Sequence, residues 1–545
     1  MSNPIRIHES LHDLYLRYLD SAMPLRYEGL HAERRKLFEA SGGVCQLPLI
    51  EPIPRYKKDV TLAEACRGMR AAAPAGPLAR TIEDFALFAA AGLFPADRRL
   101  YAHQARSLQA VAADRRNIVV TTGTGSGKTE CFLLPIFEAL VRESARWTGS
   151  DRSRAVRAML LYPLNALAED QMVRLRRAAD GASGTNGPEG SRAWLSRERA
   201  DRFYFGRYTG RTPVPGNRNP SKLQELNRLR RSAEATARAV ADDTRLRYQF
   251  PSFDDSAEMW DRWSMQEAPP DILVTNYSML NIMLMRNIES AIFQQTRDWL
   301  AESRDHVFHL VIDELHSYRG TSGTEIAYLL RLLYDRLGLA PDSSQLRILA
   351  SSASLEDTPE GRTFLGEFFA VDQDRFEIIG GAPERPRPSR TQPLAGRSAA
   401  FAGFTARWDI DRAGAVRDLA ARLDQPPPAS DDPPLALFQT LEKADVFAAI
   451  LEDYAAPETA RQLGDRVFAE SRVNPDAVAD LLHAMCHART GPNENDPAPL
   501  PIRAHLFFRN VPGLWACIDP ACPHAPQIGG ERPLGRLYSR PRLVC

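Results

Sequence analysis

A glycine-rich segment between an apolar stretch and a helix-like pattern places the strongest constraint on this chain. The stretch before it, Asn117–Val120, is typical of a buried strand, and Cys131–Phe137 after it leads into a predicted helix. A strand, a glycine-rich turn and a helix start together direct backbone N–H groups and a positive helix end at a polyphosphate. The alternative is an ordinary surface turn rich in Gly, Ser and Thr. We expect a nucleotide-binding loop made of Thr122, Gly123, Thr124, Gly125, Ser126, Gly127, Lys128 and Thr129.

Two residues at the end of this loop have specific expected roles. Lys128 would reach the β- and γ-phosphates of ATP, and the Thr129 hydroxyl would bind Mg²⁺. The strict pattern begins with glycine, whereas this chain has Thr122 at that position. A small residue there is compatible with the same loop.

Composition limits the class of protein. A chain of 545 residues divides into about three or four domains. Its 44% hydrophobic and 25% charged residues are typical of a globular protein, and the sequence predicts no membrane span. A formal net charge of zero leaves nucleic-acid contacts to local patches. Seven cysteines in so long a chain do not form a disulfide framework and indicate the cytoplasm.

The pattern along the chain predicts an α/β fold with accessory regions. Residues 1–95 read as a mostly helical domain, and residues 96–380 as a RecA-like domain with a parallel sheet and helices on both faces. Predicted strands cover 117–121, 158–162, 271–275, 307–312 and 347–351, and a polar insertion, 180–265, reads as a surface excursion. The predicted later regions are a Pro/Arg-rich linker (381–406), a helical region (407–500) and a small Cys-containing segment (501–545).

A pair of carboxylates follows the apolar run Val307–Ile312. The C-terminal end of a buried parallel strand lies at the ligand edge of its sheet, so Asp313 and Glu314 are expected there. Asp313 would hold Mg²⁺ through its water shell, and Glu314 would orient and deprotonate the attacking water. A lone acidic pair in this position is usually a solvated strand end. Its combination with the glycine-rich loop favours an ATP-hydrolysing site.

Asp313-Glu314-Leu315-His316 resembles motif II of superfamily 2 helicases, the DEAD/DEAH-box class, and the sequence through Gly320 is similar to large bacterial helicases of DNA-repair and phage-defence types. The resemblance implies an ATP-dependent helicase or translocase that acts on nucleic acid, with DNA rather than RNA as the expected substrate. By the same resemblance, Gln104 would read adenine. Ser352, Ala353 and Ser354, together with His316, would couple the ATP site to nucleic acid. The expected nucleic-acid contacts are Pro163, Asn165, Thr209, Gly210, Arg211, Thr275, Asn276 and Tyr277.

Helicases of this class have two RecA-like lobes, and the second supplies arginines from a Gln-x-x-Gly-Arg-x-x-Arg sequence. No such sequence follows Ser354. We therefore expect an N-terminal portion of a longer enzyme, or a chain whose second lobe comes from a partner protein. The alternative function is an ATP- and nucleic-acid-binding module without independent ATPase activity. A transporter-type ATPase is not supported, because its signature sequence does not occur between the two ATP motifs of this chain.

The last residues suggest part of a zinc site. Cys517 and Cys522 have the spacing of a tight turn, and Cys545 would come from a later strand. Tetrahedral Zn²⁺ needs a fourth ligand, which would be His524 or a residue beyond position 545. The alternative is a set of unliganded thiols.

Overall fold

The protein is described here from a computed structural model, which covers residues 3–542. Within that span, residues 41, 73–76, 124, 150–151, 164, 182–189, 244–245, 254–255, 319, 354, 382, 385–387, 390, 494–495, 497, 512 and 527–530 lie outside the described residues. The predicted site residues Thr124, Ser354 and Cys545 therefore lie outside the described residues, and only the backbone of Asn165 is described.

The chain divides into two compact units. One unit is Tyr56–Ala382, and the other combines Met1–Arg55 with Pro383–Cys545. This division differs from the predicted separate domain over residues 1–95. Residues 56–95 belong to the α/β unit, whereas the first 55 residues pack with the C-terminal part of the chain.

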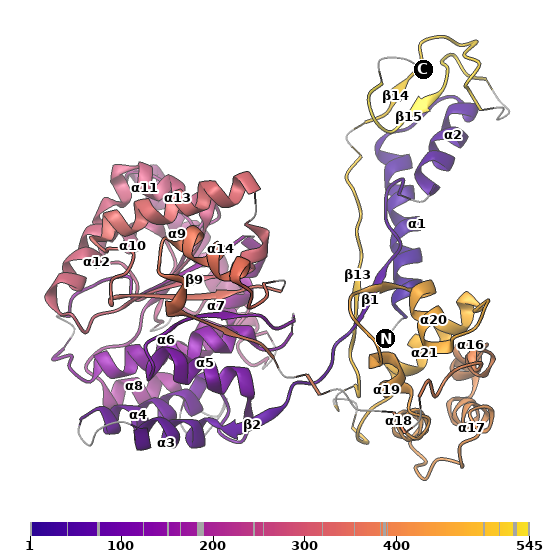
Figure 1. Cartoon of the computed structure of the whole chain (residues 1–545). Coiled ribbons are helices and arrows are strands. Elements are labelled where there is room, and N and C mark those ends of the chain that lie inside the picture. The colour runs from indigo at the N-terminus through magenta and orange to yellow at the C-terminus, as the bar shows by residue number, and fades with distance from the viewer. Residues whose placement is uncertain are drawn as a thin grey trace. The chain divides into compact units, whose positions relative to one another are not determined.

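Figure 1 shows the α/β unit with strand β9 among its helices. Its eight-stranded sheet has the order β11-β4-β10-β9-β5-β8-β6-β7. Every pairing in it is parallel. The fold class predicted from the sequence, α/β with a RecA-like parallel sheet, is confirmed. The strands are β4 (Asn117–Val120), β5 (Ala158–Tyr162), β6 (Phe205–Tyr208), β7 (Glu258–Met259), β8 (Ile272–Asn276), β9 (Phe308–Ile312), β10 (Leu346–Ser351) and β11 (Phe376–Ile379). A separate antiparallel pair joins β2 (Lys58–Thr61) and β3 (Arg99–Tyr101).

Both faces of this sheet are covered, which explains its continuous apolar strands. In β4, Ile118 and Val120 belong to one buried cluster and Val119 to the other. The alternation follows from the period of two along a strand. Helices α3 to α8 supply the first cluster, and α11 to α14 supply the second.

The helices of this unit have the following bounds: α3 (Leu62–Ala72), α4 (Pro77–Phe88), α5 (Ala102–Ala112), α6 (Lys128–Ser144), α7 (Asn165–Asp180), α8 (Ser191–Glu198), α9 (Pro220–Ala239), α10 (Arg262–Glu267), α11 (Tyr277–Met285), α12 (Ser290–Glu302), α13 (Gly320–Leu337) and α14 (Pro359–Phe369).

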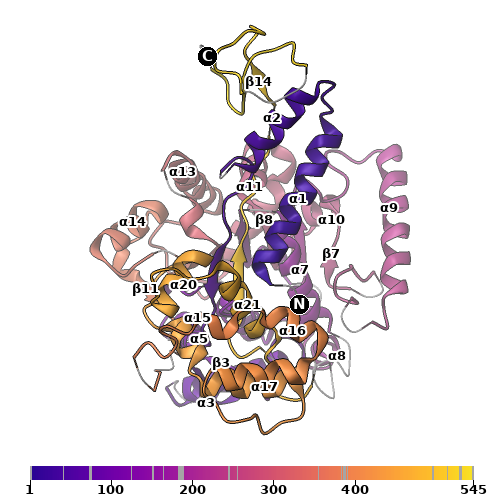
Figure 2. The ribbon, with the colours of Figure 1, turned by 90° about the vertical axis from the view of Figure 1, so that its right-hand side faces the viewer.

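The polar insertion is only partly a surface excursion. Its helix α9 has no buried residue and stands at the side of the unit (Figure 2). In contrast, β6 lies in the sheet beside β8, and its Tyr208 is fully buried. The insertion therefore contributes to the sheet as well as to the surface.

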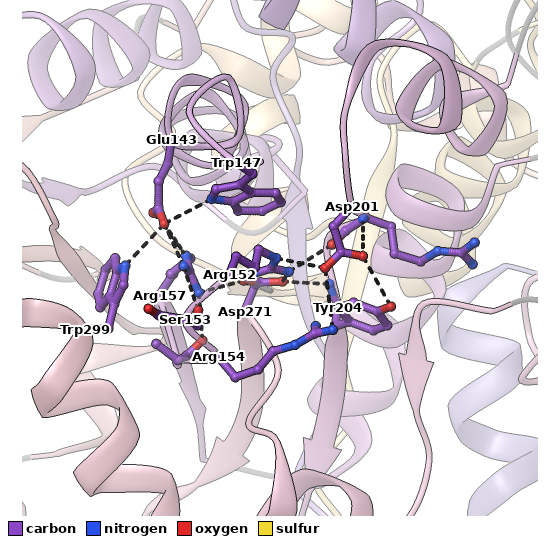
Figure 3. Close-up of polar contacts among 12 residues, drawn as sticks. Glu143, Trp147, Arg152, Ser153, Arg154, Arg157, Asp201, Tyr204, Asp271 and Trp299 are labelled. Atoms are coloured by element: carbon purple, nitrogen blue, oxygen red, sulfur yellow. Dashed lines mark hydrogen bonds and ion pairs between the residues drawn. The ribbon is translucent and has the colours of Figure 1, made fainter. Parts of the chain in front are cut away.

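A buried network of ion pairs lies at the edge of the sheet where its strands begin (Figure 3). Asp271, directly before β8, accepts hydrogen bonds from both terminal nitrogens of Arg152 at 2.7 Å and from Arg157 at 2.9 Å. Burial alone would raise the pKa of Asp271, but these two arginines hold it below its usual value. Arg152 also stacks on Trp147, with 3.8 Å between guanidinium carbon and ring centre.

The second unit is mostly helical. Its helices are α1 (Pro4–Ala22), α2 (Glu28–Glu39), α15 (Ser398–Phe401), α16 (Phe404–Ile410), α17 (Arg412–Arg422), α18 (Pro433–Lys443), α19 (Val446–Leu451), α20 (Ala460–Phe468) and α21 (Pro475–His487). Phe401 and Phe404 are fully buried in its core, so the predicted linker over 381–406 already contains packed helix.

Two small antiparallel sheets complete this unit. β1 (Leu49–Pro52) pairs with β12 (Glu458–Thr459) and β13 (Ile502–His505), and β14 (Trp515–Ala516) pairs with β15 (Leu537–Tyr538). The β1 pairings explain why the N-terminal residues belong with the C-terminal region. Across the described part of the chain, no helix is long and apolar enough to cross a membrane.

Candidate nucleotide-binding site

The C-terminal ends of three neighbouring strands carry the predicted ATP-site residues. Strand β10 pairs with β4 on one side and with β9 on the other. The loop after β4 contains the glycine-rich segment, the loop after β9 contains Asp313 and Glu314, and β10 ends at Ser351. Because parallel strands end at one edge of the sheet, these segments meet there.

The glycine-rich loop has the backbone that its sequence predicts. Gly125 and Gly127 have φ values of +84° and +75°, in the left-handed region that favours glycine. A Cβ atom at Gly127 would lie 2.3 Å from the Nε2 atom of Gln104, so a larger residue cannot fit without a shift. Thr122 and Ser126, both buried, form a hydrogen bond between their hydroxyl groups across the loop. This bond gives Thr122 a structural reason to replace the usual glycine.

Lys128 begins α6 and its ammonium group faces the carboxylates. The Nζ atom lies 3.6 Å from Oε1 of Glu314, within ion-pair range. It is buried and makes no hydrogen bond to any described residue. A buried ammonium group without hydrogen bonds is costly, and phosphate oxygens would satisfy it. The site therefore fits a polyphosphate. Thr129 follows in the first turn of α6 and is partly exposed.

Asp313 and Glu314 are held by a residue that the sequence analysis did not single out. The hydroxyl group of Ser351 donates a hydrogen bond to Oδ1 of Asp313 and accepts one from the Glu314 backbone N–H at 3.1 Å. Burial raises the pKa of Asp313, and the neighbouring Glu314 adds to this effect. A bound divalent cation would favour the charged carboxylate, so the donor set fits Mg²⁺. Glu314 adopts the left-handed conformation, with φ of +54°.

His316 lies between the carboxylates of Asp313 and Glu314 and the segment after β10. Its Nδ1 atom is 3.3 Å from Oε2 of Glu314 and 3.3 Å from the backbone nitrogen of Ala353. A neutral Nδ1 can accept from the amide, whereas a protonated Nδ1 can donate to the carboxylate. The predicted coupling residues Ala353 and His316 are thus in contact. Ser352 is buried, and its backbone N–H donates to Val120 at 3.0 Å.

Gln104 has a different environment from the one predicted. Its amide is buried: Nε2 donates to the Gly127 carbonyl at 3.0 Å, and Oε1 accepts from the Tyr101 backbone at 2.9 Å. The expectation was an amide that reads adenine. In this structure Gln104 instead ties the start of α5 to the phosphate loop.

Two aromatic side chains near the loop were missed by sequence reasoning. The Nε2 atom of His103 lies 2.8 Å from the carbonyl oxygen of Ser126, and burial lowers the pKa of His103. The Tyr56 hydroxyl accepts a hydrogen bond from the Gly123 backbone at 3.1 Å. The position of His103 beside Gln104 was a usable signal, whereas nothing in the local sequence connects Tyr56 to the loop.

The predicted nucleic-acid residues lie at the C-terminal ends of β5, β6 and β8, which are neighbours in the sheet. They do not all present side chains to the surface. Thr275 is buried and donates to the Tyr208 carbonyl at 2.6 Å, and Thr209 is also buried. Asn276 caps α11 by accepting from Met279 at 2.8 Å. Gly210, Arg211 and Tyr277 are exposed, Pro163 is partly exposed, and the side chain of Asn165 is outside the described residues.

Comparison with known proteins agrees with this geometry. Residues 101–197, which include the phosphate loop, match the DEAD/DEAH box helicase family. The chain is 31% identical over 599 aligned residues to the Druantia protein DruE of Escherichia coli, strain UMEA 4076-1. The chain carries a DEAD/DEAH box helicase domain. The alignment covers 98% of this chain but 31% of DruE, so the chain spans about a third of that relative.

The helicase domain has more distant relatives as well. The chain is 24% identical over 281 residues to the uncharacterized ATP-dependent helicase MJ1574 of Methanocaldococcus jannaschii, covering 52% of this chain and 28% of that protein. Among solved structures, the DUF1998 helicase MrfA bound to DNA matches at 16% identity with a TM-score of 0.35. That match covers 68% of this chain and 40% of the MrfA chain.

The predicted zinc site has no support. Within the described ranges, no group of three or more His, Cys, Asp or Glu residues could hold a metal ion. Cys517 and Cys522 both pack near Gly535, where an added Cβ would lie 2.8 Å and 2.5 Å from their Cβ atoms. Cys545, the predicted third ligand, lies outside the described residues.

Proposed function

We propose that this chain is the first motor lobe of an ATP-dependent helicase or translocase that acts on nucleic acid, with DNA as its substrate. The observation that carries the proposal is the convergence of Lys128 and Glu314 at one sheet edge, at 3.6 Å. A hydrogen-bonded Asp313 completes this site. A phosphate-loop lysine and two carboxylates in this arrangement are the machinery of phosphoryl transfer to water.

Bound Mg²⁺ neutralises charge on the phosphate oxygens of ATP. The loop amides and Lys128 would hold the phosphate chain, and the Thr129 hydroxyl group and the Asp313 carboxylate would hold the cation. Glu314 orients the attacking water and accepts its proton. Ser351 fixes both carboxylates, because it bonds to the Asp313 side chain and to the Glu314 backbone.

The exposed loops after β5, β6 and β8 are the proposed nucleic-acid face. Arg211 supplies a cation, Gly210 allows close backbone approach, and Tyr277 offers a ring for stacking. Thr209, Thr275 and Asn276 shape these loops through their own hydrogen bonds. His316 and Ala353 would transmit changes at Glu314 toward this face. DNA is the proposed substrate because the sequence from Asp313 to Gly320 resembles helicases that include DNA-repair types.

A second candidate is an ATP- and nucleic-acid-binding module that does not hydrolyse ATP alone. The sequence favours this reading in one respect, since it contains no Gln-x-x-Gly-Arg-x-x-Arg segment. Arginines of that kind contribute about three to five orders of magnitude to turnover. The second lobe would then come from a longer chain or a partner protein.

ATP hydrolysis by residues 1–545 and by a longer form, each with single-stranded DNA or RNA, separates these candidates. The motor proposal predicts DNA-stimulated hydrolysis that is lost in Lys128→Ala. ATP and DNA binding without hydrolysis in the short form, with hydrolysis restored in the longer one, supports the module. Hydrolysis that neither polynucleotide stimulates in either form would contradict both.

A further inference from the structure

A cavity lies in the α/β unit, at the sheet edge opposite the proposed ATP site. It has a volume of about 430 Å³ and is bordered by α6, by the residues preceding β4 and by the first residues of β9 and β10. Parallel strands begin at this edge and end at the ATP site. The cavity is therefore separate from the nucleotide-binding loop and has no role in the proposed hydrolysis.

The cavity wall is rich in positive charge. Two carboxylates, Glu143 and Asp305, line it together with six arginines: Arg115, Arg142, Arg146, Arg157, Arg304 and Arg347. The guanidinium groups come from five separate segments of the chain. Their gathering around one space is a property of the fold and not of a local sequence run.

The two carboxylates are already engaged. Glu143 accepts hydrogen bonds from Arg157 at 2.6 Å, from Trp299 at 3.2 Å and from Trp147 at 3.4 Å (Figure 3). Asp305 pairs with Arg146 at 3.4 Å, and both side chains are largely exposed. Neither carboxylate is therefore available to neutralise the other arginines.

Four arginines of the wall remain without a strong acidic partner. Arg115 and Arg304 are exposed, and their side chains make no hydrogen bond or ion pair with the described residues. Arg142 lies 3.6 Å from Glu138, and burial raises the pKa of that carboxyl group. Arg347 is 4% exposed and donates to the backbone carbonyl of Arg115.

Arg347 has no acidic partner among the described residues. Burial and the nearby Arg375, Arg115 and Arg142 lower its pKa to about 10. His309, also in the wall, has its pKa lowered to about 3 by burial and by Arg347 and Arg142. A buried guanidinium group is normally paired with an anion. The part of the chain that the structure describes supplies no such anion for Arg347.

We propose that this cavity binds a small phosphate-bearing anion. Guanidinium groups match the tetrahedral oxygens of phosphate with paired N–H donors, and several can share one ligand. Val111, Ile136 and Leu140 provide an apolar side of the cavity. Arg115 and Arg304, being exposed, lie where a ligand enters. The site would bind a soluble phosphate compound independently of ATP hydrolysis.

Calorimetric titration with inorganic tripolyphosphate tests this site. Lys128→Ala serves as the background, without Mg²⁺, so that the nucleotide-binding loop contributes little. We expect saturable binding with a stoichiometry of one. Adding Arg115→Ser with Arg304→Ser should weaken it at least about tenfold, because charge-assisted hydrogen bonds are lost. These residues are exposed, so the variant should keep the melting temperature of its parent.

The matched control is Arg228→Ser with Arg231→Ser in the same background. Both arginines are exposed on α9, and the change in net charge is identical. Unchanged affinity in this control supports a specific site. The proposal is overturned if no saturable binding occurs in the Lys128→Ala background. It is equally overturned if both pairs of substitutions weaken binding to the same extent, since that result shows attraction by overall charge.

Discussion

The ammonium nitrogen of Lys128 lies 3.6 Å from a carboxylate oxygen of Glu314. The two residues follow different strands, β4 and β9, which are separated in the sheet by β10. Glu314 thus occupies the space beside the lysine that the terminal phosphate of ATP would approach. The pairing connects nucleotide binding to the residue that would activate water.

Glu314→Gln should separate binding from hydrolysis. The amide keeps the size of the side chain but cannot accept a proton from water, so hydrolysis should fall by about two to four orders of magnitude. Affinity for Mg·ATP should stay equal or rise, because Lys128 loses a competing anion. Fluorescent-nucleotide binding and phosphate release measure the two effects. A parallel loss of both would contradict the assigned role.

Ser351→Ala tests the residue that sequence reasoning missed. Loss of its hydroxyl group frees Asp313 and leaves the Glu314 N–H with one fewer acceptor. We expect Mg²⁺-dependent nucleotide affinity to fall by about tenfold. Ser351→Thr is the matched control, since it retains the hydroxyl group. Equal behaviour of the two variants would show that this hydrogen bond does not position the carboxylates.

Much of the α/β unit was predictable because its strands are buried on both faces. The run at 158–162 was predicted with the observed ends, three other predicted strands differ by one residue at one end, and 271–275 differs by one residue at both ends. β6 was missed because it is a four-residue strand inside a polar insertion. The pairing of Glu51 with Arg503 was equally hidden, since long-range register leaves no local signal.

Some residues of the candidate site were predictable from local sequence, and others depend on the fold. Gly127, Lys128 and Asp313 belong to sequence patterns that encode their chemistry directly. Ser351 precedes the predicted segment Ser352–Ser354 by one residue, and only the strand register shows which hydroxyl group faces Asp313. The hydrogen bonds of Gln104 to Tyr101 and Gly127 were not predictable, because a sequence pattern does not reveal which partners a side-chain amide finds in the fold. Its contact with adenine stays a prediction.

Asp271→Asn should strongly destabilise the α/β unit. The substitution removes a buried charge that is bound by Arg152 and Arg157, and leaves both guanidinium groups undercompensated. A loss of about 3–5 kcal/mol is expected from denaturant unfolding. Glu267→Gln is the control: its pair with Arg218 is exposed, so the change should stay below about 1 kcal/mol. Similar losses of unfolding free energy in both variants would contradict the claim that burial makes the Asp271 ion pairs more important than an exposed pair.

Stability should depend on His309 at acidic pH. Its folded pKa is about 3, below the ordinary 6.5, because it is buried near Arg347 and Arg142. The unfolded chain therefore binds more protons between these values. The contribution of neutral His309 to the free energy of unfolding is fully present above pH 6.5. It falls by about 1.4 kcal/mol per pH unit as the pH drops toward 3. His309→Asn should reduce this slope between pH 6 and 4, as measured by denaturant unfolding. An unchanged slope would show that another group controls acid sensitivity.

Equilibrium binding of Mg·ATP to the chain and to Lys128→Ala tests whether the glycine-rich loop binds nucleotide. We expect saturable binding by the parent chain and a loss of at least about a hundredfold in affinity in the variant. The melting temperature should stay within a few degrees, because Lys128 makes no hydrogen bond to the described residues. Mg·ATP affinity that is undiminished in a folded Lys128→Ala protein would contradict the assignment of this loop as the nucleotide site.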